Sequence, residues 1–123
     1  MASHKKELKR FFGGDAQSAL EQADVFAWQP DLNRKPMKYF IAMRMTQDEF
    51  KAWATSAGLE TAPTALVPSG IWVLPGGAKL SHWIDGNAKP ASFIDARSTT
   101  NSDAQIWCRW MDGFAYAVIV PSY

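Results

Sequence analysis

The sequence predicts a single α+β domain with a mostly antiparallel sheet of about five strands, one main helix packed on one face and a C-terminal β-hairpin. Two local signals favour this class. Residues 46–58 carry a full set of helix start and stop signals, and residues 106–120 form two alternating runs around an Asp-Gly pair. A length of 123 residues fits one hydrophobic core without a second domain.

The chain begins with a basic segment, residues 1–14, ahead of the domain at residues 15–123. The first ten residues carry four basic side chains and one acidic side chain. We expect Asp15 to start a second short helix over residues 16–23, because an N-cap aspartate accepts hydrogen bonds from the free amides of the first turn. Residues 29–36, which contain two prolines, are predicted to form a loop.

The first predicted strand spans residues 37–45. One face would carry Tyr39, Ile41, Met43 and Met45, and the other Phe40, Ala42 and Arg44. Both faces are mostly apolar, so the strand is expected to be central in the sheet and covered on at least part of both sides.

The main helix is predicted over residues 47–57. Thr46 and Glu49 fit a capping box, in which each side chain accepts a hydrogen bond from the other residue's amide. Behind the box an apolar face recurs at helical spacing: Phe50, Trp53, Ala54 and Ala57. Gly58 would close the helix in the left-handed conformation, with Leu59 making the hydrophobic contact that accompanies such a cap.

The middle of the chain gives three further strand candidates, at residues 71–74, 80–85 and 91–97. Loops are expected at residues 60–70 and 98–103, which are rich in proline, glycine and small polar side chains.

The C-terminal residues predict a hairpin, because the runs at 106–111 and 114–120 flank Asp112-Gly113, a pair that two-residue type I′ turns prefer. This turn sets the register. One face would then pair Met111 with Phe114, Arg109 with Tyr116 and Trp107 with Val118. The other face would set Trp110, Cys108 and Ile106 against Ala115, Ala117 and Ile119. Because that second face pairs large with small residues, we expect the Phe50 and Trp53 side of the helix to pack near it.

Composition and motifs argue against several kinds of site. The two histidines and the single cysteine show no metal-ligand spacing, so no metal or other cofactor is expected. Residues 75–79 contain glycines and a lysine but fit a turn better than a phosphate loop. A net charge of +1 gives no field suited to nucleic acid. Cys108, within a predicted strand, is expected to be a small buried hydrophobic residue.

The first residues lack the apolar stretch of a secretory signal, which favours a cytoplasmic location. A periplasmic or membrane-tethered location is the alternative, if an N-terminal signal or anchor has been removed. No apolar run approaches the ~20 residues of a transmembrane helix.

Six tryptophans are the unusual feature of the composition. Three of them, Trp53, Trp72 and Trp110, lie in apolar patterns and are expected in the core. Trp83 and Trp107 would share strand faces with Asp85 and Arg109, which favours exposure and contact with a partner. Arg109 beside Trp107 and Tyr116 would suit a cation–π stack. Trp28 is expected to hold a loop over the sheet edge. The predicted partner-binding residues are therefore Trp107, Arg109, Tyr116, Trp83 and Trp28.

Several of these features together resemble a group of known proteins. They are the strand-to-helix segment at residues 44–50, its Gly58-Leu59 closure, the Trp72-Val73-Leu74-Pro75 strand end, and the hairpin with Trp110, Asp112-Gly113 and Tyr116. The chain resembles small uncharacterised bacterial α+β proteins, some of them lipoprotein-like, and is similar in size and single-domain form to immunity proteins of bacterial toxin systems. The resemblance covers about residues 37–120, and it implies no catalytic residues.

The leading hypothesis is therefore a protein-binding module that breaks no bonds, of the immunity type that neutralises a toxin by steric occlusion. One alternative is a small-ligand or glycan-binding cleft lined by Trp28, Trp72 and Trp83, with His82 and Asp85 as polar contacts. Another is a small hydrolase or transferase that uses His82 with Asp85 or Asp95.

Overall fold

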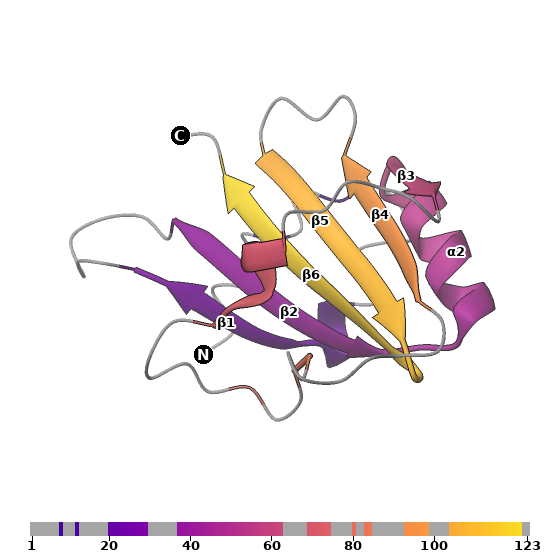
Figure 1. Ribbon diagram of the computed structural model, residues 1–123, viewed down its shortest axis with the longest axis horizontal. Helices are drawn as coiled ribbons and strands as arrows, with labels where there is room; N and C mark the ends of the chain where they lie inside the picture. The colour runs from indigo at the N-terminus through magenta and orange to yellow at the C-terminus, as the bar shows by residue number, and fades with distance from the viewer. Residues whose placement is uncertain are drawn as a thin grey trace.

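The computed structural model describes residues 8, 12, 20–29, 37–62, 69–74, 80, 83–84, 93–98 and 104–121. These residues form an α+β domain with one helix and a six-stranded antiparallel sheet, which confirms the predicted class with one strand more than expected (Figure 1). The elements are β1 (Asp24–Trp28), β2 (Lys38–Arg44), α2 (Gln47–Ser56), β3 (Leu59–Ala62), the short 3₁₀ helix η3 (Ser69–Trp72), β4 (Ile94–Ser98), β5 (Ala104–Met111) and β6 (Phe114–Pro121).

The strand order is β1-β2-β6-β5-β4-β3. The N-terminal pair β1–β2 therefore joins the C-terminal hairpin β5–β6 through the contact between β2 and β6. Strand β2 lies inside the sheet between β1 and β6, next to one edge strand, and both of its faces are covered, as its alternation predicted. Ile41 on one face and Phe40 on the other are both buried.

The helix α2 starts at the predicted residue and ends at Ser56, one residue before the predicted end. The Thr46 hydroxyl accepts from the Glu49 amide at 3.1 Å, and the Glu49 carboxylate accepts from the Thr46 amide at 2.9 Å. Ala57 is the C-cap, and Gly58 follows at φ +75°, where a side chain would strain the backbone. In Figure 1 the helix lies at the end of the sheet formed by β3 and β4.

The hairpin also has the predicted register. Asp112 and Gly113 both have positive φ, as a type I′ turn requires. Met111 pairs with Phe114, Arg109 with Tyr116 and Trp107 with Val118.

Side chains on the two faces of the sheet form two cores. The first, the helix-side core, joins Phe50, Trp53 and Ala54 of α2 to Cys108 and its neighbours on the sheet, as predicted. Leu8 and Phe12 lie in the same core. The second core occupies the opposite face and contains Phe40, Ala42, Trp72, Met111, Tyr116 and Val118. The η3 segment crosses this opposite face (Figure 1).

Several predictions for the irregular part of the chain are wrong. Residues 60–62, expected to belong to a loop, instead lie in strand β3 (Leu59–Ala62), because Gly58 turns the chain back and places Leu59 in the helix-side core. Residues 71 and 72 of the strand expected at 71–74 belong to η3 instead. There the Trp72 carbonyl accepts a hydrogen bond from the Trp83 indole instead of a neighbouring strand. Strand β1 was not expected, and β4 begins at Ile94 and includes Ser98.

Parts of three further predictions lie outside the described residues. Residues 80, 83 and 84 of the strand expected at 80–85 are described, and they lie outside regular structure. Residues 20–22, within the second short helix expected at 16–23, form a 3₁₀ turn. The loop expected at 29–36 lies outside the described residues except for residue 29. Among the described helices, none combines the length and apolar character that a membrane crossing demands.

Candidate functional site

The predicted partner-binding residues belong to the face of the sheet opposite α2. One row of side chains crosses that face from β3 to β1, and its members pair strand by strand as Glu60, Arg97, Trp107, Val118, Phe40 and Phe26. Glu60 and Arg97 are exposed and Trp107 is half-buried, whereas Val118 and Phe40 are buried. Exposure therefore falls along the row from the β3 edge toward the centre of the sheet.

Arg109 lies one step along β5 from Trp107 on this face and is held by an ion pair. Its Nε and Nη2 atoms donate to the two carboxylate oxygens of Asp95 at 2.7 and 3.0 Å. Asp95 is only 3% exposed, and the Arg109 side chain is 22% exposed. Such a two-bond pair fixes the plane of the guanidinium group.

Two aromatic rings contact the same guanidinium group. The Arg109 Cζ atom lies 4.4 Å from the ring centroid of Phe93 and 5.5 Å from that of Trp72. The sequence placed Arg109 in a stack with Trp107 and Tyr116, and that expectation is wrong about the rings. The cation is instead positioned by Asp95, Phe93 and Trp72, since β4 pairs with β5 and the Trp72 ring of η3 lies against Arg109.

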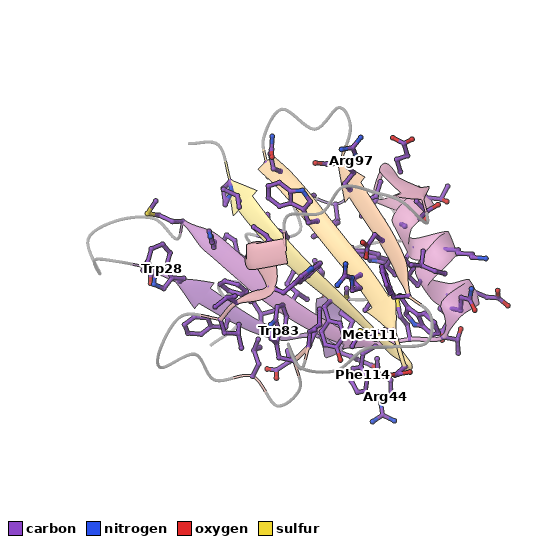
Figure 2. The ribbon with its side chains drawn as sticks, in the orientation of Figure 1. Trp28, Arg44, Trp83, Arg97, Met111 and Phe114 are labelled. Atoms are coloured by element: carbon purple, nitrogen blue, oxygen red, sulfur yellow. The ribbon has the colours of Figure 1, made fainter. Side chains whose placement is uncertain are left out.

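Trp83 and Trp72 cover the centre of the face. The Trp83 ring lies 5.7 Å from Phe40, 5.4 Å from Tyr116 and 6.2 Å from Trp72. Its indole N–H donates to the Trp72 carbonyl at 2.7 Å. Figure 2 shows Trp83 against the β1–β2 side of the sheet. These contacts pack Trp83 against the second core, where its side chain is half-buried.

Tyr116 is consequently buried beneath Trp83 and is 2% exposed. It cannot contact a partner in this conformation, so its predicted role at an interface is wrong. Burial, together with the charge of Asp112, raises the pKa of Tyr116 to about 12. Trp28 is half-buried and packs at the edge of the second core, at the opposite end of the sheet from Arg97 (Figure 2).

The residues proposed for a cleft or for catalysis have other partners or lie outside the described part of the chain. Trp72 is 8% exposed, and its ring is tilted by 53° to that of Trp83, so these two indoles do not form parallel walls. His82 and Asp85 lie outside the described residues. Both oxygens of Asp95 accept from Arg109, which leaves this carboxylate committed to the ion pair.

The described residues contain no group of three or more histidine, cysteine, aspartate or glutamate side chains that could hold a metal ion. Cys108 is fully buried among apolar side chains in the helix-side core. Burial, and secondarily the charge of Asp95, raises the pKa of the Cys108 thiol far above its usual range. A thiol in this environment does not supply a thiolate near neutral pH.

One solvent-exposed part of this face lies at strands β4 and β5. We call it the Trp107 surface, and it consists of Phe93, Arg97, Trp107 and the exposed part of Arg109. Phe93 is 40% exposed. Trp107 belongs to neither core, and within the described chain its indole N–H has no acceptor. Arg97 likewise forms no ion pair with a described residue.

Comparison of the chain with models of protein families, with curated proteins and with solved structures found no match. Sequence reasoning identified Trp107 and Arg109 but did not assign Phe93 and Arg97 to the surface. The alternation at residues 91–97 places Phe93, Asp95 and Arg97 on one face, and pairing that strand with β5 would have found them.

Proposed function

We propose that this chain is a protein-binding module that catalyses no reaction, and that it contacts its partner through the Trp107 surface. The observation that carries the proposal is the environment of Trp107, a large apolar side chain that is half-buried, packs in neither core and finds no acceptor for its indole N–H among the described residues. Tryptophan and arginine are the residue types most enriched where truncation costs the most binding energy. Trp107 and Arg97 stand beside each other as cross-strand partners.

The rigidity of the surface supports the same function. Arg109 is fixed by Asp95 and by two rings, and β5 has a neighbouring strand on each side. A pre-organised surface loses little conformational entropy on binding. Steric occlusion of a toxin needs only such a surface, so we place the partner among toxin domains, in keeping with the resemblance to immunity proteins. A net charge of +1 gives no steering toward a strongly basic cleft, so a toxin without one fits better.

The test is capture of the partner by the full chain, with a matched pair of variants. Immobilised wild type, Trp107→Ala and Arg44→Gln are each exposed to extract from the source cell. Arg44 is an exposed arginine that also stacks on an aromatic ring, Phe114, at the far end of the same face (Figure 2).

We expect Trp107→Ala to retain at least about tenfold less partner than wild type, because a central tryptophan at an interface contributes about 2 kcal/mol or more. Arg44→Gln should retain the partner fully. Equal recovery by wild type and Trp107→Ala would remove this surface from the proposal. If the captured protein is a toxin domain, its activity on its own substrate should fall as the chain is added, and unchanged activity would contradict occlusion.

A further inference from the structure

On the Trp107 surface, the side-chain polar groups that have no partner among the described residues are all hydrogen-bond donors. We infer that the partner presents a carboxylate to this surface, an inference that deepens the proposed function and rests on it. The Arg97 guanidinium, the Trp107 indole N–H and the Nη1 group of Arg109 have no acceptor within the described chain, and all of them are donors. The carboxylate of Asp95 already accepts a hydrogen bond from Arg109 at each of its two oxygens.

A carboxylate matches these donors better than a neutral group does. A guanidinium group donates two parallel hydrogen bonds to a carboxylate, and such charge-assisted bonds are roughly twice as strong as neutral ones. Arg97 and Trp107 are directly paired across β4 and β5, which brings their side chains to about 5 Å at Cβ. An acidic side chain of the partner can therefore bond Arg97 while an apolar or aromatic neighbour covers the Trp107 ring.

Glu60 provides an internal check on this inference. It pairs with Arg97 from the other side, on β3, and it is exposed. Its negative charge repels an incoming carboxylate, while the charge of Arg97 attracts it. Neutralising these two neighbours must therefore change the affinity for an acidic partner in opposite directions.

A nucleic acid phosphate is also an acceptor, but the charges around this surface favour a protein carboxylate. Of its two arginines, Arg109 is neutralised by Asp95, and Glu60 lies next to Arg97. Binding to a phosphate backbone depends on several unneutralised cations that replace condensed counterions.

The experiment is an NMR titration of the full ¹⁵N-labelled chain with defined probes. The acidic probe is the peptide Ac-Gly-Glu-Phe-Glu-Gly-NH2, its neutral match replaces both glutamates with glutamine, and the third probe is a ten-nucleotide thymidine strand. The chain has six tryptophans, so the Trp107 indole N–H signal is identified by its loss in Trp107→Phe. The binding constants come from the shift of that signal.

We expect the acidic peptide to bind roughly threefold to tenfold more tightly than the glutamine peptide, since an exposed charge pair contributes a modest free energy. Arg97→Gln should weaken the acidic peptide by a similar factor, Glu60→Gln should strengthen it, and Arg44→Gln should leave it unchanged. Unfolding curves should show that Arg97→Gln and Glu60→Gln stay folded, because both side chains are exposed.

Equal binding of the acidic and glutamine peptides, or no shift with either peptide, would overturn the inference. The same holds if Arg97→Gln and Glu60→Gln change affinity in the same direction, and tighter binding of the thymidine strand would point to nucleic acid instead. None of these results decides the proposed function, which stands or falls with partner capture by Trp107→Ala. If Trp107→Ala lost the partner but the acidic and glutamine peptides bound equally, the Trp107 surface would be an interface that does not select carboxylates.

Discussion

Asp95→Asn is the substitution that tests how the face opposite α2 is held together. The change keeps the shape of the side chain and removes its charge. In wild type both carboxylate oxygens accept from Arg109, at 2.7 and 3.0 Å, and the carboxylate has almost no exposure to water. An asparagine can accept only one of these bonds, and its amide group then faces a second donor.

The loss of stability expected for Asp95→Asn depends on how well the carboxylate and the guanidinium are each shielded from water. Removing one partner of a buried ion pair typically costs about 3–5 kcal/mol, because the remaining charge is left without compensation. The Arg109 side chain is 22% exposed and stays between two rings, so water and the aromatic faces recover part of that loss. We therefore expect Asp95→Asn to lower the free energy of unfolding by about 3 kcal/mol, with a fall of roughly 10 °C in Tm for a domain of this size.

Urea unfolding followed by far-ultraviolet circular dichroism and by tryptophan fluorescence measures this cost. Arg109→Met and the double variant complete a cycle that isolates the interaction between the two side chains. The double variant should be more stable than the sum of the single losses predicts, by about 2 kcal/mol, because neither charge is then left buried alone. A loss below about 1 kcal/mol in Asp95→Asn, or additive losses in the cycle, would refute the ion pair as the element that secures this face.

Three further predictions concern buried groups. Cys108 should not react with a thiol reagent at pH 8 until urea unfolds the chain, since burial raises the pKa of its thiol, and rapid labelling of the folded protein would contradict this. Tyr116 has a folded pKa of about 12 against an ordinary value of 10.0, so the folded state keeps its proton where the unfolded state loses it. The free energy of unfolding should therefore fall as pH rises from 10 toward 12. Absorbance at 295 nm should show one phenolate forming late in the titration, and Tyr116→Phe should remove that step. A tyrosine titration that is complete by pH 11 would contradict the raised pKa. Trp110→Phe loses a 2.8 Å hydrogen bond to the Met45 carbonyl, whereas Trp72→Phe removes an indole N–H that is buried without a partner. Trp110→Phe should therefore cost about 1 kcal/mol more in urea unfolding, and equal costs would contradict this.

The parts of the fold that the sequence predicts correctly depend on contacts between near neighbours. The Thr46 and Glu49 capping box closes within four residues, and the Asp112-Gly113 turn fixes a register that then extends along both strands. In each case the residues that decide the conformation lie a few positions apart, so the pattern carries the information.

The parts that the sequence does not predict depend on distant partners. Leu59–Ala62 shows no apolar alternation, and it becomes strand β3 because β4, more than thirty residues later, offers a free edge beside the end of α2. Ile71 and Trp72 have the composition of a strand, but they form part of η3, and their side chains pack against the second core while their backbone stays outside the sheet. Local composition cannot separate these two outcomes.

The same limit explains why Trp83 and Trp107 have different environments although exposure was expected for both. Alternation along a strand tells which side chains share a face, and it carries no information on which part of that face another segment covers. Trp72 and Trp83 cover the face near Tyr116, because the Trp83 indole bonds the Trp72 carbonyl and both rings pack there. That covering reaches Arg109 and ends before Trp107, whose neighbour on β4 is the exposed Arg97. A mutation that loosens the Trp72 segment should therefore expose Tyr116 before it changes the surroundings of Trp107. Such a mutation would lower the stability of this face while leaving the Trp107 surface able to bind a partner.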